Sequence, residues 1–360
     1  MQAAQLGGNV ASGSRTMLDM DSELPRELTL ADIARIAGVG LGTASRALSG
    51  MPNVSPATRQ KVLDVAKKHA YVVSPDASRL KKGSTGRVAV VAPHLSRWFF
   101  GAILEGIESV LRESQFDVLL YHVGNLEDRT SFFERLPARR KVDAVIVVGF
   151  PVEEAERRSL ELMLGVQVVA AGGQHEVYPH VCIDDLRAGG QAMGHLLGLG
   201  HQRIAMIEAI DPDQPRQPSG RSRAYHLALA DAGIKPDPSL VVTTDWGGEQ
   251  GAAAMAQLLS VAELPTAVYA HSDEVAFGAM RTIRDAGLRI PEDISIIGID
   301  DHPHAALLHL TTIKQDARLQ GVLTAQMLLG LLRQEEDTAL SVTVDTHLVV
   351  RRTTAAPRSD

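Results

Sequence analysis

The 360-residue sequence predicts an all-α helix-turn-helix domain followed by a larger α/β domain of two lobes. Two observations carry this prediction. Near the N-terminal end, three short helical segments are separated by a glycine turn and a proline break. From residue 87 onward, continuous apolar runs alternate with amphipathic stretches. The length of the chain suits a small domain joined to a large one.

The small domain begins with a helix after Thr29, which is followed three residues later by an acidic residue, as in a capping pair. Gly38 ends this helix, because the tight turn needs a positive φ that glycine adopts at little cost. A second helix is expected over Leu41–Leu48, and Ser55 with Pro56 opens a third as N-cap and first-turn proline. Two short helices joined by a glycine turn, with a third in support, predict a helix-turn-helix that binds DNA.

Charge separates this small domain from the rest of the chain. Residues 27–83 hold nine lysines and arginines against four acidic residues, whereas the whole chain has a formal net charge of −7. A basic domain on an acidic body is expected where only that domain meets phosphates. A three-helix bundle used for protein contacts is the alternative, and the charge argues against it.

Two segments lie outside the predicted domains. Residues 1–27 are rich in Gly, Ser and Ala without periodicity, which is typical of a disordered leader. Residues 74–85 start with a serine and a proline suited to a helix start, so they form either a hinge helix that folds only on DNA or a plain Lys-rich linker. These assignments leave 28–73 for the DNA-binding domain and 86–355 for the bilobed domain.

The sequence predicts a soluble, cytoplasmic protein. No apolar run approaches the length of a membrane span, and the N-terminal residues lack the pattern of a secretory signal. Cys182 is the only cysteine, so it forms no internal disulfide and is expected to be a buried, inert thiol.

Apolar runs in the second domain predict parallel strands that are buried on both faces. A first series comprises residues 88–93, 117–123, 143–149 and 166–172, and a second comprises 203–208, 239–243, 266–270 and 294–300. Amphipathic stretches at 100–114, 127–139 and 153–164 predict helices between the strands of the first series. Two doubly wound lobes follow, and a ligand is expected beyond the carboxyl ends of the strands, between the lobes.

Several motifs resemble those of the lactose-repressor (LacI/GalR) family of bacterial transcription regulators. AGVGLGTASRAL (37–48) resembles the family's DNA-binding headpiece, and LTTIKQDARLQG (310–321) resembles its C-terminal region. The resemblance covers almost the whole chain after residue 28. It implies a type I periplasmic-binding-protein-like effector domain, a homodimer, a roughly palindromic DNA operator, and allosteric control by a small molecule, for which a carbohydrate is the expected class. It also implies that residues 310–321 cross back between the lobes before a helix at 316–333.

The resemblance places DNA contacts on the headpiece and the hinge. Arg46 is the expected base reader, because its planar fork can bond O6 and N7 of guanine together. Leu41 and Gly42 stand where the family usually selects its operator; Leu41 suits a thymine methyl, and Gly42 offers no side chain. Leu80 matches a leucine that the family's hinge helix inserts into the minor groove. Phosphate contacts, which set register without reading sequence, are implied at Thr43, Ser45, Asn53, Ser55 and Thr58, and Thr29 is a further implied DNA-binding residue.

The resemblance also implies an effector pocket built from strand ends and helix starts. The implied effector-binding residues are Arg97, Trp98, Phe99, Phe100, Arg221, Trp246, Ser272, Asp273 and Asp300. Within this set an arginine holds ligand oxygens, a tryptophan stacks on the ligand ring, and the serine and aspartates accept hydrogen bonds from hydroxyls. SRWFF (96–100) departs from the family's usual SNPFF, which places an arginine and a tryptophan near the pocket mouth.

No enzymatic activity, metal or cofactor is expected. The sequence contains no Gly-x-Ser-x-Gly elbow and no phosphate loop, and the aspartates and histidines of residues 300–309 lack zinc-like spacing. The first hypothesis is therefore an effector-controlled transcription regulator, expected to be a repressor. The alternative is a sugar-binding or catalytic protein whose headpiece is vestigial, and operator binding separates the two.

Overall fold

The computed structural model describes residues 28–71, 84–163, 165–173, 175, 177–211 and 219–358. The chain divides into two compact units, residues 1–83 and 84–360. The predicted leader, Leu80 and nearly all of the predicted hinge lie outside the described residues. Within the described ranges, no helix is long and apolar enough to cross a membrane.

The first unit contains the predicted helix-turn-helix and its supporting helix, α1 Leu30–Ile36, α2 Leu41–Leu48 and α3 Pro56–Lys68. Thr29 and the side chain at N3 of α1 form a reciprocal capping box. Gly38 has φ of 64°, the left-handed conformation that the predicted turn requires. Ile33 and Val62 are fully buried at the centre of a small core that also contains Ala34 of α1 and Ala44 and Ala47 of α2. The helix-turn-helix prediction is therefore confirmed.

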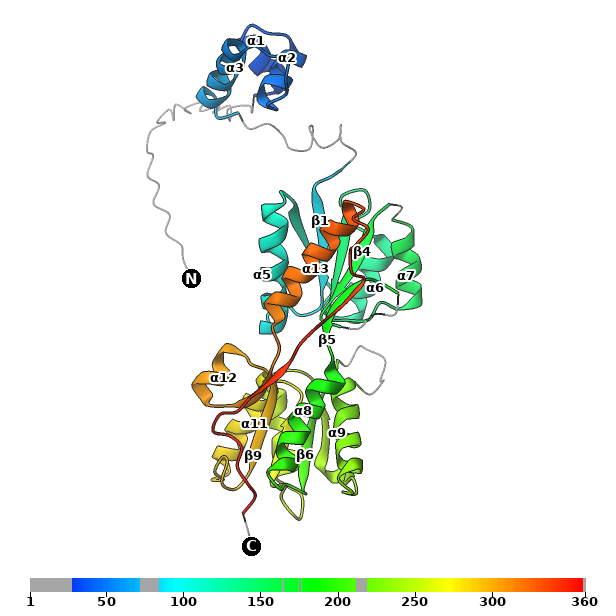
Figure 1. Ribbon diagram of the computed structural model, residues 1–360, viewed down its shortest axis with the longest axis vertical. Coiled ribbons are helices and arrows are strands. Elements are labelled where there is room, and N and C mark those ends of the chain that lie inside the picture. Colours follow the sequence, from blue (N-terminus) through cyan, green and yellow to red (C-terminus); the bar gives the residue numbers. More distant parts are fainter. Residues whose placement is uncertain are drawn as a thin grey trace, which may run out of the picture. The chain divides into compact units, whose positions relative to one another are not determined.

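The second unit consists of two α/β lobes, as predicted, and each contains a six-stranded sheet (Figure 1). The sheet of lobe one has the order β11-β5-β4-β3-β1-β2 and is parallel throughout. Its strands are β1 Arg87–Ala92, β2 Asp117–His122, β3 Ala144–Val148, β4 Gln167–Ala171, β5 His180–Ile183 and β11 Ser341–Val344. Its helices are α5 Trp98–Glu113, α6 Leu126–Arg135, α7 Glu154–Glu161 and α13 Ala317–Leu332.

The sheet of lobe two has the order β12-β10-β9-β8-β6-β7, and only β12 runs antiparallel to its neighbour. Its strands are β6 Ile204–Ala209, β7 Val241–Thr244, β8 Ala267–Ala270, β9 Ser295–Asp300, β10 Thr311–Lys314 and β12 His347–Val349. Its helices are α8 Asp185–Gly198, α9 Gly220–Asp231, α10 Gly248–Leu258, α11 Asp273–Asp285 and α12 Pro303–Leu308, with a short 3₁₀ helix, η1 Pro238–Leu240.

The chain crosses between the lobes three times, after β5, after β10 and after β11. As predicted, the second crossing returns the chain from the sheet of lobe two to the next helix, α13; the structure shows that α13 packs on α5 in lobe one (Figure 1). The close approach of these helices depends on Gly321, where a Cβ atom would lie 2.1 Å from the carbonyl oxygen of Ile103. Three crossover segments therefore join the two lobes.

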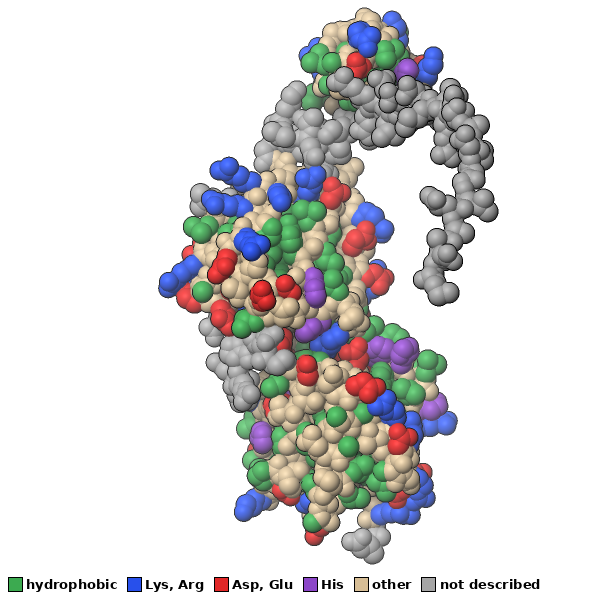
Figure 2. Space-filling view, turned by 180° about the vertical axis from the view of Figure 1, so that it is seen from behind, with side chains coloured by type: hydrophobic (Ala, Val, Ile, Leu, Met, Phe, Trp, Pro, Cys, Tyr) green, Lys and Arg blue, Asp and Glu red, His purple; other side chains and the backbone are tan. Residues whose placement is uncertain are grey.

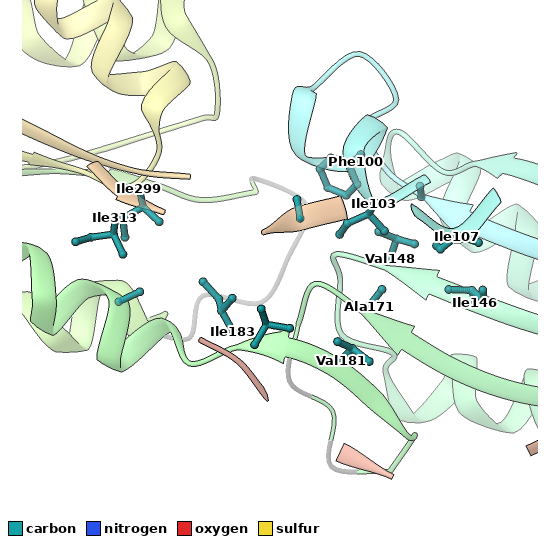
Figure 3. Packing of buried hydrophobic residues seen from close by; sticks show 14 of the residues in the cluster. Phe100, Ile103, Ile107, Ile146, Val148, Ala171, Val181, Ile183, Ile299 and Ile313 are labelled. Carbon is teal, nitrogen blue, oxygen red and sulfur yellow. The ribbon is translucent and has the colours of Figure 1, made fainter. Parts of the chain in front are cut away.

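The core of lobe one lies between α5 and the parallel strands (Figure 3). Ile103 and Ile107 of α5 face Ile146 and Val148 of β3, and all four are fully buried. The central strands β1 and β3 are buried on both faces, since a second cluster packs α6 and α7 against the opposite side of the sheet. The prediction of a strand buried on both faces is wrong for β2, because β2 lies at the edge of the sheet and none of its residues is fully buried. This rigid packing fixes the carboxyl ends of the strands, where the candidate ligand site is found.

Candidate functional site

The exposed face of α2 is the candidate DNA-reading surface. Leu41 is 55% exposed and Arg46 is also exposed, and the Arg46 guanidinium has no hydrogen-bond partner within the described part of the chain. Gly40 is the N-cap of α2 and offers no side chain to the free backbone N–H groups. Arg59 of α3 braces the end of α2 by donating to the carbonyl oxygen of Ala47 at 3.2 Å. The helix is thus held from behind, with its polar face open.

The other predicted headpiece residues lie around this face. Thr29 and Ser55 are N-caps of α1 and α3, and Ser55 Oγ donates to Thr58 Oγ1 at 2.8 Å. Asn53 is exposed in the loop before α3 with φ of 70°. Thr43, Ser45 and Gly42 lie on α2 itself. The helix starts place backbone N–H groups and hydroxyls together, an arrangement suited to phosphate oxygens.

The second unit contains a cavity of about 750 Å³ between its two lobes. Strand ends and helix starts of both lobes line it, as predicted. The lining residues are Pro93, His94, Arg97, Phe99, Phe100, Gly149 and Gly172 of lobe one, Gln315 of a crossover, and Asp185, Glu208, Ala209, Ile210, Asp211, Ser219, Arg221, Thr243, Thr244, Asp245, Trp246, His271 and Asp300 of lobe two. Figure 2 shows charged side chains and histidines gathered where the lobes meet.

Arg221 and Asp300 form the charged floor of the cavity. The Arg221 guanidinium donates through Nε to Asp185 Oδ1 at 2.8 Å and through Nη1 to the carbonyl oxygen of His271. Asp300 is 5% exposed, and its Oδ1 accepts a hydrogen bond from Gln315 Nε2 at 2.6 Å. Burial raises the pKa of Asp300, while the positive charge of Arg221 acts in the opposite direction. Nη2 of Arg221 and Oδ2 of Asp300 have no hydrogen-bond partner among the described residues, so both atoms remain available to a ligand.

Backbone strain marks the same floor. Asp300 has φ of 140° and the next residue, Asp301, has φ of 56°, although neither is glycine. Non-glycine residues in this region cost free energy and cluster at functional sites. The Arg351 guanidinium pairs with Asp301 at 2.5 Å and holds the turn in place.

His271 and Glu208 are further polar groups of the wall. Nδ1 of His271 lies 3.4 Å from the carbonyl oxygen of Ala209, and Nε2 has no partner among the described residues. Burial and the charge of Arg221 lower the pKa of His271 to about 3, so its ring is neutral. The Glu208 carboxylate accepts hydrogen bonds from the hydroxyls of Ser222 and Thr243.

Comparison with known proteins shows to which family the chain belongs. Residues 29–74 match the family model described as bacterial regulatory proteins, lacI family, and residues 193–354 match that of a periplasmic binding protein-like domain. The HTH-type transcriptional repressor CytR of Escherichia coli (strain K12) is 31% identical over 334 residues, which are 91% of this chain and 96% of that protein. The chain belongs to the LacI family. The resemblance predicted from its motifs is therefore confirmed.

Other LacI-family proteins match over similar lengths. The HTH-type transcriptional regulator CelR of Thermobifida fusca is 32% identical over 342 residues, which are 91% of this chain and 99% of that protein. A solved CelR–cellobiose complex matches with a TM-score of 0.67 at 31% identity. The match covers 91% of this chain and 99% of the CelR chain. The lac repressor dimer bound to operator and the anti-inducer ONPF has a TM-score of 0.80 at 26% identity, with 92% and 100% covered.

The fold brings six of the nine predicted effector-binding residues to the cavity. These are Arg97, Phe99, Phe100, Arg221, Trp246 and Asp300. The aromatic residues come from both lobes, and the charged pair lies between them. A cavity with aromatic faces and a few convergent polar groups is the usual form of a small-molecule site.

The other three predicted residues do not line the cavity, because other elements already hold their side chains. Ser272 is the N-cap of α11, and Asp273 accepts hydrogen bonds from the Thr312 hydroxyl at 2.6 Å and from the His302 backbone N–H at 2.8 Å. The ring of Trp98 packs edge-on against that of His302, with centroids 5.3 Å apart. These three contribute to the frame of the LacI-family site rather than to its surface.

The sequence analysis missed several lining residues that a simple signal identifies. His94 directly follows the predicted strand 88–93, Glu208 ends the strand 203–208, and His271 follows the strand 266–270. Because ligands lie beyond the carboxyl ends of parallel strands, each of these positions was a candidate by place alone. Asp185 lies just past a strand that was not predicted, so no such signal was available for it.

Proposed function

We propose that this LacI-family protein is a cytoplasmic transcription repressor that binds a roughly palindromic operator as a homodimer. Under this proposal residues 28–73 form the DNA-binding domain, residues 74–85 a hinge helix with Leu80 as its wedge, and residues 86–355 the effector-binding and dimerisation domain. The similarity to the CytR repressor and to the operator-bound lac repressor dimer supports the assignment. The open polar face of α2, with Arg46 free to read a base, supports it from the structure.

We further propose that a small carbohydrate in the interlobe cavity controls operator binding. The observation that carries this part is the set of groups that line one cavity: free N–H groups of Arg221, a free acceptor oxygen of Asp300 and the ring of Trp246. A sugar ring presents an apolar face to an aromatic side chain and hydroxyls to charged partners, so it matches this combination. The CelR–cellobiose complex shows a sugar bound by a relative of similar length.

Selection of operator DNA from a random pool tests the first proposal. Full-length protein is mixed with random duplexes at moderate salt, and bound DNA is sequenced after successive rounds. We expect enrichment of a two-fold symmetric sequence, with two half-sites recognised by two headpieces. Recovery of no sequence over random DNA would favour the alternative, a ligand-binding protein with a vestigial headpiece.

A screen of mono- and disaccharides tests the second proposal. A ligand that binds the folded protein raises its melting temperature by mass action, so thermal shift finds candidates without knowledge of the operator. Each candidate is then added to the selected operator complex. A sugar that stabilises the protein and changes operator affinity is expected, and binding that leaves operator affinity unchanged would contradict the regulatory role.

A further inference from the structure

The mouth of the cavity carries an ion pair that joins the two lobes. Arg97 lies at the start of α5 in lobe one, and Glu274 lies in the first turn of α11 in lobe two. The Arg97 Nε atom is 3.2 Å from Glu274 Oε2, and the two side chains are only 17% and 23% exposed. A partly buried pair of this kind is screened by solvent less than a surface pair.

Glu274 also completes the N-terminus of α5. The N-cap residue of this helix is Arg97, whose side chain makes no capping hydrogen bond. The backbone N–H of Trp98 instead donates to Glu274 Oε1 at 3.4 Å. A carboxylate is favoured at this end of a helix because the free N–H groups and the helix dipole present positive charge. One side chain of lobe two therefore both caps a sixteen-residue helix of lobe one and pairs with its N-cap residue.

The same arginine covers Trp246 of lobe two. The guanidinium carbon lies 4.4 Å from the centroid of the Trp246 ring and 5.6 Å from that of Phe100. This distance is in the range of a cation–π contact. The ring of Trp246 is the stacking face that the proposed function assigns to the effector. The Arg97 guanidinium occupies that face.

We propose that Arg97, Glu274 and Trp246 form a clasp that holds the two lobes together. Arg97 belongs to lobe one and both of its partners belong to lobe two, so separating the lobes breaks the ion pair, the cap and the cation–π contact together. A ring that stacks on Trp246 must first displace the guanidinium. The displacement of the guanidinium by a ligand rests on the proposed function. The clasp itself involves neither ligand nor DNA. Arg97 thereby sets which ligands reach the aromatic face.

The chain offers a direct reporter of the clasp, because its only two tryptophans are Trp98 and Trp246. The Trp98→Phe variant leaves Trp246 as the single fluorophore and keeps the backbone N–H that Glu274 accepts from. Acrylamide quenching is then measured on the effector-free, full-length protein. Glu274→Ala is expected to raise the quenching constant of Trp246 roughly twofold, because loss of the pair frees the guanidinium from the ring.

Glu249→Ala is the matched control. Glu249 of α10 pairs with Arg281 of α11 at 2.9 Å. The substitution therefore removes an arginine–glutamate pair whose two residues both belong to lobe two. This variant is expected to leave the quenching of Trp246 unchanged. Added salt is expected to change the quenching of the parent protein less than Glu274→Ala does, because a partly buried ion pair is screened less than a surface pair.

A second reporter tests whether Arg97 and Glu274 hold the lobes together or whether Arg97 only shields the Trp246 ring. In the Trp246→Phe variant the fluorophore is Trp98, whose ring packs on His302 of the opposite lobe. Glu274→Ala is expected to raise the quenching of Trp98 as well, since opening the lobes separates that contact. Arg97→Gln is expected to reproduce both effects, and the double variant to add nothing further.

Unchanged quenching of either tryptophan in a Glu274→Ala protein that melts at the parent temperature would overturn the proposal. If Glu274→Ala fails to fold, the Arg97→Gln protein gives the same decision from the other lobe. These measurements use neither DNA nor sugar, so a failure to select an operator would count against the proposed function and leave the clasp intact.

Discussion

Replacement of Asp300 by asparagine is expected to preserve operator binding and remove most of the response to the effector. The carboxylate lies at the floor of the cavity, where Gln315 holds Oδ1 at 2.6 Å and Oδ2 is free to accept a hydrogen bond from a ligand. An asparagine side chain that keeps the bond from Gln315 places an NH₂ group where Oδ2 was. It also leaves the charge of Arg221 without its facing carboxylate.

The size of the effect follows from the loss of a charged acceptor. Hydrogen bonds to charged groups contribute about 1.5–3 kcal/mol, which corresponds to roughly tenfold to a hundredfold in affinity. Folding is not expected to suffer, because burial raises the pKa of Asp300 and the ionised form is therefore costly to bury. A weaker response then reports on the ligand contact and not on unfolding.

The assay is a titration of labelled operator with protein at graded concentrations of the effector that the screen identifies. Glu249→Gln is the matched control, because Glu249 is a carboxylate of the same lobe that pairs with Arg281 and does not line the cavity. Half-maximal response of Asp300→Asn at the parent effector concentration would refute the assigned contact. Failure of the variant to bind operator without effector would show that the residue is structural instead.

Three further predictions concern the headpiece, the hinge and pH. Arg46→Ala is expected to cost roughly 1–3 kcal/mol of operator binding and to relax selection at one base pair, so an unchanged selected sequence would exclude it as a reader. Leu80→Ala is expected to weaken operator binding with little change on random DNA, because an apolar wedge gains only where the base step can be kinked; equal losses on both would point to a damaged headpiece. Burial holds the pKa of His271 at about 3 in the folded protein, whereas the unfolded chain takes up the proton near the ordinary value of 6.5. Stability is therefore lost on acidification, and between about pH 7 and pH 5 the parent protein is expected to lose about 2 kcal/mol more than His271→Gln in denaturant unfolding. Equal losses would contradict a buried neutral imidazole.

Local signals explain most of what the sequence predicted. The second helix of the headpiece spans Leu41–Leu48 in the structure as predicted, because glycine on one side and the loop with its proline on the other mark its ends. The eight predicted strands all exist, since continuous apolar runs of that length are typical of strands buried on both faces. Their bounds differ by a residue or two; the run 239–243, for example, begins with η1 before β7.

Four strands were not predicted, because each forms only by pairing with a strand that is distant in the sequence. The missed strands β5 (HVCI), β10 (TTIK), β11 (SVTV) and β12 (HLV) contain three or four residues each with polar residues among them, so they give no continuous apolar run. Ser341 of β11 pairs with His180 of β5. These two strands meet only because the chain returns from lobe two to lobe one between them. The strands that connect the lobes are thus a product of tertiary structure.

Contacts between residues that are distant in the sequence also decide which predicted residues line the cavity. Asp273 was expected to be a ligand acceptor because it matches an effector contact of the family at the start of a helix. Its carboxylate is instead taken by Thr312 and His302, which lie about thirty to forty residues further along the chain. The pairing of Arg97 with Glu274 across the lobes was equally invisible, because 177 positions separate them.

The coupling between the cavity and the operator is the central claim, and calorimetric titration of the effector into the protein with and without operator tests it most directly. Allosteric coupling is reciprocal, so operator must change effector affinity by the same factor by which effector changes operator affinity, typically about fivefold to 150-fold. We expect the two factors to agree. Equal effector affinity in the presence and absence of operator would contradict the account.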